Sequence, residues 1–233
     1  IYLVSRQERS IVVGRPYIYL AVDTATHLIA GVYIGFSCDE TAVMACIEQA
    51  TMDKVAYCAR YGIEITPEQW PSAGMPSEII TDQGREFFGP RMSELCRRYG
   101  LEVLTLPPFR PDCKGAVEKT IDLLQQRYKP MLRGRGVIED DAQERWATDY
   151  RTQATLDLDD FARVVIHSVL YLNSGRLTDG KTPAERWLEM SPRLMTVDME
   201  ELHIQTLSRD TAKLTRKGIR INRIWYAPDD AEG

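Results

Sequence analysis

Apolar residues recur at strand spacing in the first part of the chain. The runs YIYLAVD at 17–23 and LIAGVYIGF at 28–36 are rich in β-branched and aromatic residues and are separated by four residues. Such a pair of runs predicts an antiparallel hairpin. Residues 1–4 predict the end of a strand whose beginning is missing, and the polar residues 5–15 predict a mobile link with a turn.

Helical spacing begins after this hairpin. Ser37 with Glu40 three residues later fits a capping box, and apolar residues continue at helical spacing until Gly62 lies past the end. These signals predict one helix over 37–59. A small capped turn is predicted at 66–69.

The middle of the chain alternates strand-like and helical patterns. Glycine and proline residues bound each segment, which makes the segment ends easier to predict. We predict a strand at 79–82, a helix at 90–99, a strand at 101–106 and a helix at 115–132.

The last part of the chain changes character. Short β-like runs replace the longer helical patterns after residue 191. We predict an exposed acidic connection at 139–160, a helix at 160–172, a short helix to Met190 opened by a capping box of Thr182 and Glu185, and strand-like runs at 202–207 and 218–226.

Composition narrows the possible functions. The chain has 233 residues and a net charge of −5, which argues mildly against nucleic acid on bulk electrostatics. Lys and Arg nevertheless gather at 127–135 and 213–223 and can form local basic surfaces. No apolar run approaches ~20 residues, so no membrane span is predicted. The five scattered cysteines form no CxxC pair, which favours a reducing compartment over a zinc site or disulfide framework.

Two acidic residues stand out by their positions. Asp82 follows a strand-like run and Glu118 lies in a helical run, with 35 residues between them. A carboxylate at the end of a strand can meet one from a returning helix, and such a pair can hold hard divalent cations. The alternatives are that Asp82 is a turn residue capping the next helix and that Glu118 pairs with Lys114 one turn earlier.

Three neighbours of these acids have structural interpretations. Gly84 is expected to let the chain leave the strand without a clash at Cβ. Phe87 is expected in the core, and Gly115 is expected to permit close packing of its helix against the sheet.

The stretches TDQGREF at 81–87 and PPFRPDCKGAVEK at 107–119 resemble the catalytic core of the DDE transposases and retroviral integrases. The spacing of Asp82 and Glu118 is similar to the spacing of the last two acids in that family. GRPYIYLAVDTATHLIAGVYIGF at 14–36 resembles its second and third strands. Within the family, KVAYCARYGIEITPEQWP at 54–71 and RKGIRINRIWYAPDD at 216–230 look most like the TnsB-type transposases, relatives of bacteriophage Mu transposase.

The resemblance implies a fold and a domain organisation. It implies an α/β fold, with a ribonuclease-H-like mixed sheet and flanking helices over residues 1–190. Residues 191–233 are then a linker and the start of a small C-terminal β-barrel. They are too few for a whole barrel.

The third acid of the DDE family is expected outside this chain. In the family the first acid lies on the first strand, ahead of the hairpin, and residues 1–4 look like the run just after it. Asp23 lies at the end of the second strand and resembles a structural turn residue, held by hydrogen bonds to nearby backbone amides. Since Ile1 is not a natural start residue, we interpret the chain as a fragment whose first acid precedes Ile1, and Asp23 is a weaker candidate for third ligand.

The resemblance also implies an activity and its partners. Two Mg²⁺ or Mn²⁺ ions would be held by Asp82, Glu118 and the third acid, for cleavage at 3′ DNA ends followed by strand transfer. The implied partners are transposon-end DNA, target DNA, an AAA+ ATPase of the TnsC type, a TnsA-type endonuclease and further copies of the chain. The expected location is the bacterial cytoplasm at the nucleoid. The alternatives are a binding scaffold without turnover and a ribonuclease-H-like nuclease without strand transfer.

Basic residues near Glu118 and near the C-terminal end are candidates for phosphate contacts, with a merely solvated surface as the alternative. Retroviral integrases keep lysines one and two turns beyond the acid, where this chain has Asp122 and Gln125, so its DNA contacts must be arranged differently. Near the C-terminal end, alternate residues from Arg216 fit one face of a strand, and Trp225 and Tyr226 are expected in the core. The DNA-binding candidates are Arg110, Lys114, Lys119, Arg127, Lys129, Lys213, Arg216, Lys217, Arg220 and Arg223.

Overall fold

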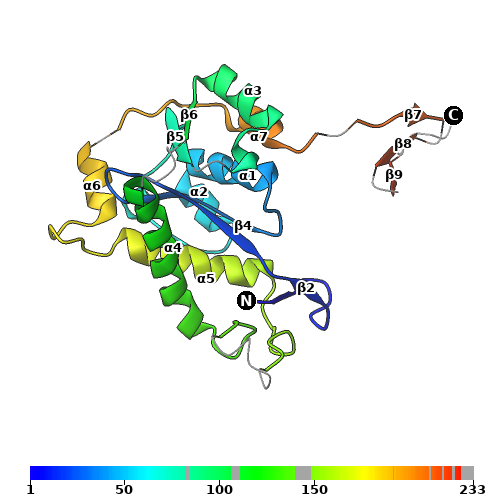
Figure 1. Ribbon diagram of the computed structural model, residues 1–233, viewed down its shortest axis with the longest axis horizontal. Helices are drawn as coiled ribbons and strands as arrows, with labels where there is room; N and C mark the ends of the chain where they lie inside the picture. Colours follow the sequence, from blue (N-terminus) through cyan, green and yellow to red (C-terminus); the bar gives the residue numbers. More distant parts are fainter. Residues whose placement is uncertain are drawn as a thin grey trace.

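Two antiparallel strands lie in the middle of the molecule (Figure 1). β3 (Tyr17–Val22) pairs with β4 (Ile29–Gly35), and Leu20 lies opposite Val32. This confirms the predicted hairpin. The computed structural model describes residues 1–81, 84–105, 111–139, 148–190, 192–209, 211–216, 218–221 and 224–226, with the backbone alone described for 111–114.

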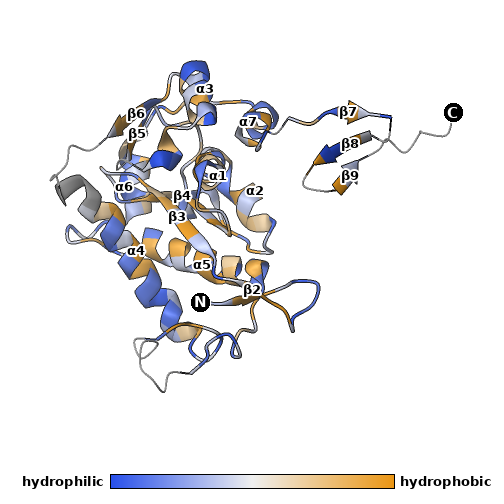
Figure 2. Ribbon diagram, turned by 45° about the vertical axis from the view of Figure 1, so that its right-hand side comes forward, coloured by the Kyte–Doolittle hydropathy of each residue, from blue (hydrophilic) through white to orange (hydrophobic). Residues whose placement is uncertain are grey.

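Helices cover both faces of this hairpin, as Figures 1 and 2 show. Side chains alternate between the faces of a strand. Leu20 packs toward α4 (Pro111–Met131) and α5 (Leu158–Asn173), whereas Tyr19 packs in the cluster that includes α1 (Glu40–Thr51). Within the described residues, one apolar core therefore lies on each side of β3 and β4, and a smaller cluster forms around Leu28, Ala184 and Trp187.

The contact between α1 and β4 is close at one glycine. A Cβ added to Gly31 would lie 2.6 Å from the Cβ of Ala50. The hydrogen-bonding groups of β4 that do not face β3 are bound by side chains. The Ile29 N–H donates to Asn173 Oδ1 at 2.9 Å, and the Val32 N–H donates to Gln49 Oε1 at 2.6 Å. Side chains therefore occupy this edge of the strand.

The helix predicted over 37–59 is two helices. α1 is capped by Asp39, whose side chain accepts a hydrogen bond from the Thr41 N–H, so the predicted capping box of Ser37 and Glu40 is wrong. The backbone is extended at Met52, and α2 (Lys54–Ala59) begins anew with Asp53 as its cap. The capped turn at 66–69 is confirmed as a 3₁₀ turn, Pro67–Gln69.

A second strand pair lies beyond α1. β5 (Glu78–Thr81) runs parallel to β6 (Glu102–Thr105), with Ile79 opposite Val103. Between them lie a 3₁₀ turn, η2 (Arg85–Phe87), and α3 (Pro90–Tyr99), which ends at Gly100 with φ +66°. This strand–helix–strand order was predicted. Phe87 is half-buried against the core of α1 and α3.

The strands do not form one continuous ladder among the described residues. β1 (Leu3–Val4) pairs with β2 (Val12–Gly14), and the other pairs before residue 110 are β3 with β4 and β5 with β6. The predicted mixed sheet is present among the described residues as separate antiparallel and parallel strand pairs. Buried side chains, rather than ladder hydrogen bonds, join these pairs.

The connection after α4 is less exposed than predicted. Residues 140–147 lie outside the description, but Tyr150, Leu156 and Asp157 are buried. Asp157 caps α5 together with Asp160. Apolar and capping side chains in this segment therefore hold part of it against the core.

The strand predicted at 202–207 is a helix. After α6 (Pro183–Met190), α7 (Met199–Thr206) begins at Asp198, whose carboxylate accepts from the backbone N–H groups of Glu200 and Glu201. Leu202 is fully buried in the core shared with α1 and α3. The Asp198 cap and the burial of Leu202 favour a helix here, although the sequence pattern predicted a strand.

Three short strands end the described chain and lie apart from the rest (Figure 1). β7 (Leu214–Thr215), β8 (Gly218–Ile221) and β9 (Ile224–Tyr226) form an antiparallel sheet. Trp225 and Tyr226 are 47 % and 54 % exposed, so their predicted place in the core is wrong. Among the residues described, no helix is both long enough and apolar enough to cross a membrane.

Candidate functional site

The carboxyl ends of β5 and β6 lie at the same edge because the two strands are parallel. β5 ends at Thr81, which is buried, and the next residue in the chain is Asp82. Asp82 itself lies outside the described residues. The three atoms nearest to an added Cβ at Gly84 belong to the flexible carboxyl end of Glu86, at 2.8–2.9 Å, so the described contacts give no evidence of backbone crowding at this glycine.

Glu118 lies on the exposed side of the first half of α4. In Figures 1 and 2 the N-terminal end of α4 lies on the side of the molecule where β5 and β6 lie. Gly115 is exposed, and a Cβ there would meet no described atom within 4 Å. The expectation that Gly115 permits close helix packing is therefore wrong for the described part of the chain.

Carboxylate oxygens are the donors that hard cations such as Mg²⁺ take. Glu118 offers such a donor from an exposed position, and its donor chemistry fits the implied metal. No group of three or more His, Cys, Asp or Glu placed to hold a metal occurs among the described residues, which do not include Asp82.

Asp23 is engaged in the turn between β3 and β4. Its Oδ2 accepts from both the backbone N–H and the hydroxyl of Thr26, each at 2.7 Å. The following residue, His27, has φ 63° in the left-handed region. The predicted hydrogen bond from a backbone amide is confirmed.

Glu40 and Arg91 join α1 to the beginning of α3, a relationship that the sequence did not suggest. Glu40 Oε1 accepts from the backbone N–H groups of Arg91 and Met92, and Glu40 Oε2 binds Arg91 Nε at 3.1 Å. Arg91 also donates to the Thr206 carbonyl at 3.1 Å. Residues 83–89 separate Asp82 from α3 in the sequence, and these bonds fix the position at which the described part of this loop, 84–89, meets α3.

Tyr19 in β3 has a raised pKa. Burial, with a smaller contribution from the Glu86 carboxylate, raises the pKa of Tyr19 to about 12. Tyr19 packs edge-to-face on Tyr33, with 6.1 Å between ring centroids. A neutral, packed phenol of this kind supports the wall beside the loop and is not a proton donor at neutral pH.

Two lysines on α4 are exposed, Lys119 and Lys129. Lys129 is eleven residues after Glu118, which is about three helical turns, so the two share one stripe of the helix. Asp122 and Gln125 lie between them on that stripe. A basic side chain is thus available on the stripe of Glu118, but further from the acid than in the integrase pattern.

Arg127 stacks on an aromatic ring. Its guanidinium lies 3.9 Å from the ring centroid of Tyr171 in α5, and the tyrosine is 53 % exposed. A guanidinium over an exposed ring can still offer N–H donors to a phosphate. The predicted DNA role of Arg127 is compatible with this packing and is not tested by it.

The other candidates divide between the C-terminal strands and the undescribed positions. Lys213, Arg216 and Arg220 are exposed, and the Arg220 guanidinium lies 5.7 Å from the ring centroid of Trp225. β8 begins at Gly218, so the predicted alternation from Arg216 does not run along one strand. Four candidates lie outside the description, wholly or in their side chains: Arg110, Lys114, Lys217 and Arg223.

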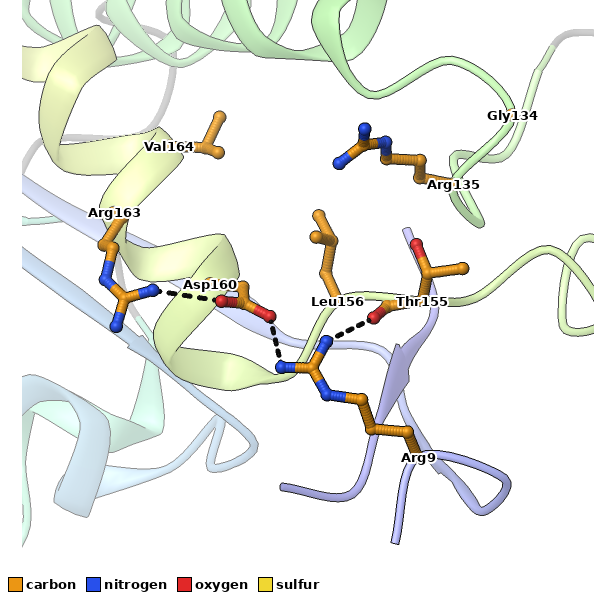
Figure 3. Close-up of a pocket in the computed structure, with 8 residues that line it drawn as sticks. All are labelled: Arg9, Gly134, Arg135, Thr155, Leu156, Asp160, Arg163 and Val164. Atoms are coloured by element: carbon orange, nitrogen blue, oxygen red, sulfur yellow. Dashed lines mark hydrogen bonds and ion pairs between the residues drawn. The ribbon is translucent and has the colours of Figure 1, made fainter. Parts of the chain in front are cut away.

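An open hollow lies at the other end of α4 (Figure 3). It has a volume of about 780 Å³ and is lined by Arg9, Gly134, Arg135, Thr155, Leu156, Asp160, Arg163 and Val164. Arg9 binds Asp157 at 3.1 Å and Asp160 at 2.9 Å. The predicted link at 5–15 includes the short strand β2, and the ion pairs of Arg9 connect it to the beginning of α5.

Comparison with known proteins identifies the family. Residues 1–134, more than half of the chain, match the family model for the TnsB C-terminal domain. The chain belongs to this family. The match includes both Asp82 and Glu118 and confirms the TnsB-type resemblance.

The chain is also similar to the transposon Tn7 transposition protein TnsB of Escherichia coli. The two are 29 % identical over 245 aligned positions, which cover 97 % of this chain and 34 % of the relative. The chain thus spans about a third of the length of that protein.

Solved structures of retroviral integrases are also similar. The catalytic core domain of BIV integrase is 20 % identical, with a TM-score of 0.45, and the alignment covers 76 % of this chain and 88 % of that one. The catalytic core domain of HTLV-2 integrase in complex with magnesium is 13 % identical, with a TM-score of 0.45 over 79 % and 89 % of the two chains.

Proposed function

We propose that this chain is the catalytic core of a metal-dependent DNA transposase, which cleaves the 3′ ends of a transposon and joins them to target DNA. The observation that carries the proposal is the match of residues 1–134 to the TnsB C-terminal domain, because this stretch contains both candidate acids. The relation to Tn7 TnsB over nearly the whole chain supports the same activity.

Asp82 and Glu118 are proposed as ligands of two Mg²⁺ or Mn²⁺ ions. When bound, such ions activate the attacking oxygen and stabilise the leaving oxygen of an in-line displacement at phosphorus. Asp82 follows the last residue of β5 in the sequence, and Glu118 lies in the first half of α4, which supports this assignment. Lys119, Lys129 and Arg127 on α4 are proposed to hold the DNA backbone beside these acids.

The third acid is proposed to precede Ile1 in the natural sequence. The two short hydrogen bonds from Thr26 occupy one oxygen of Asp23, which supports a role in the turn. We therefore assign Asp23 to stability and not to the metal.

The proposed fold has two parts. The order of an antiparallel hairpin, a helix and two parallel strands supports a ribonuclease-H-like core. The sheet of β7, β8 and β9 is proposed as the beginning of a small β-barrel, with a domain boundary near residue 190. Its exposed Lys213, Arg216 and Arg220 are proposed as a second DNA contact, together with Lys217 and Arg223.

The proposed partners are transposon-end and target DNA, an AAA+ ATPase of the TnsC type and a TnsA-type endonuclease. Several copies are proposed to assemble on DNA, and the site of action is the bacterial nucleoid. The kinship with a Tn7 transposition protein supports these partners.

A strand-transfer assay tests the proposal. The chain, extended by its natural upstream residues, is incubated with pre-nicked transposon ends, a target plasmid and Mn²⁺. Joined product supports a transposase, cleavage alone supports a nuclease, and binding without either supports a scaffold. Asp82→Asn and Glu118→Gln should each abolish joining. Asp122→Asn is the matched control, since it removes an exposed carboxylate one turn further along the same helix.

A further inference from the structure

The hollow at the end of α4 brings together three arginines from distant parts of the sequence (Figure 3). Arg9 comes from the loop after β1, Arg135 from the turn after α4, and Arg163 from α5. Asp160 is the one acid in the lining, so the lining carries a net charge of about +2. Asp157, which also binds Arg9, is buried beneath it.

Two of these arginines are held in fixed positions. Asp160 binds Arg9 through one carboxylate oxygen at 2.9 Å and Arg163 through the other at 3.0 Å. Arg9 also donates to the Thr155 carbonyl, and Arg163 donates to the Tyr61 carbonyl. Arginines fixed in this way lose little side-chain freedom when an anion binds, which lowers the cost of binding.

The third arginine has unused donors. Within the described residues, the Arg135 side chain makes no hydrogen bond or ion pair and is exposed. In Figure 3 it extends from its turn across the hollow toward α5. Arg135 thus supplies a full charge and the planar fork of donors that matches phosphate oxygens.

The location favours a nucleic-acid phosphate over an acidic peptide. The hollow lies where α4 ends, and the stripe of Glu118 and Lys129 leads toward this end of the helix. From Glu118 to Met131 the helix axis is roughly 20 Å long. Because one DNA strand advances about 3.4 Å per phosphate, this length corresponds to about six nucleotides.

We infer that this arginine hollow is a second phosphate-binding site, which takes a backbone phosphate of DNA about six nucleotides from the proposed catalytic acids. The inference rests on the proposed function, since it assumes that DNA lies along α4. Arg135 is its main ligand, and Asp160 positions Arg9 and Arg163 around the same phosphate.

The test is the affinity of the 233-residue chain for a dye-labelled DNA duplex, measured by fluorescence anisotropy between about 50 and 200 mM salt. Arg135→Gln should weaken binding roughly five- to tenfold and reduce the slope of log K against log salt by about 1. Arg135→Lys should retain most of the affinity because it keeps the charge. Thermal melting should be unchanged, because Arg135 is exposed.

Arg133→Gln is the matched control. It removes the same charge two residues away, from a side chain that pairs with Glu139 outside the hollow. If the wild type binds DNA and both variants behave alike, the hollow takes no phosphate, while the proposed function stands. If poly-glutamate binding, and not DNA binding, depends on Arg135, the occupant is an acidic peptide and the inference is wrong. If the wild type binds no DNA at any salt concentration, the inference and the proposed function both fail.

Discussion

The carboxylate of Glu40 binds the beginning of another helix, 51 residues along the chain at Arg91. It accepts two backbone N–H groups of α3, at 2.9 and 3.0 Å, and the Arg91 guanidinium at 3.1 Å. The two side chains are only 16 % and 13 % exposed. A Cβ at Gly89 would overlap the Glu40 carboxylate, so glycine is the residue that fits there. A negative group at a helix N-terminus is stabilising, more so when partly buried.

Glu40→Gln should lower the free energy of unfolding by about 2–3 kcal/mol, because the amide cannot accept all three hydrogen bonds and leaves Arg91 without a counter-charge. Urea denaturation measures this change. Glu189→Gln is the control. The ion pair of Glu189 with Lys181 is about half exposed on both sides, so this substitution should change the free energy of unfolding by less than about 0.5 kcal/mol. Equal effects of the two substitutions would contradict the role given to Glu40.

Asp23 and Glu118 should separate stability from activity. Asp23→Ala removes two hydrogen bonds from Thr26, which is buried, and should cost about 1–3 kcal/mol of stability while strand transfer by the extended chain persists. Glu118→Gln should leave stability within about 0.5 kcal/mol of the wild type and abolish strand transfer. Loss of strand transfer in a folded Asp23→Ala variant would make Asp23 a metal ligand.

Two glycines should respond to alanine in opposite directions. Gly31→Ala places a methyl group 2.6 Å from Ala50 Cβ and should destabilise the fold by about 1–3 kcal/mol. Gly115→Ala meets open space in a helix and should stabilise by about 0.5–1 kcal/mol. Thermal melts of the two variants suffice. A destabilising Gly115→Ala would show that the glycine is needed for a contact with the undescribed residues near it.

Lys54 should make stability depend on pH. Its ammonium group is buried, donates to the carbonyls of Ala50 and Met52 at 2.8 and 2.7 Å, and lies 5.8 Å from the centroid of Trp70. Burial lowers its pKa from 10.5 to about 7. Above pH 7 the unfolded chain therefore binds more protons at this position than the folded chain, and the Lys54 contribution to stability rises until about pH 10.

The measurement is urea denaturation of the wild type and Lys54→Met at pH 7 and pH 9.5. The free energy of unfolding of the wild type minus that of Lys54→Met should be larger at pH 9.5 than at pH 7, by on the order of a few kcal/mol. Comparing the two proteins is necessary because burial raises the pKa of the Cys46 and Cys58 thiols from 9.0, which lowers stability above about pH 9 in both. A difference that does not change with pH would show that Lys54 stays charged when folded.

Local signals in the sequence predicted most elements correctly. The hairpin of β3 and β4 follows from alternating β-branched residues, and Gly100 ends α3 in the left-handed conformation that glycine favours. The box of Thr182 and Glu185 is present as two reciprocal hydrogen bonds. Each of these signals acts between residues close together in the chain.

The wrong predictions involved choices between distant partners. Glu40 fitted a capping box with Ser37, but a better partner lies in α3. The 202–207 segment has a strand-like composition, yet burial of Leu202 against α1 and α3 accompanies a helix. Trp225 and Tyr226 are aromatic, but about half of each remains exposed because the described chain packs no core against them.

The sequence by itself determined the family, the two candidate acids and the order of most elements, because these depend on residue identities and short spacings. Only the tertiary structure decided which charges meet: Glu40 with Arg91, and Arg9 with Asp157 and Asp160. The physical reason is that a charged side chain can pair with many others of opposite sign along a chain. Packing of the two cores brings a few of them within hydrogen-bonding distance and keeps the rest apart.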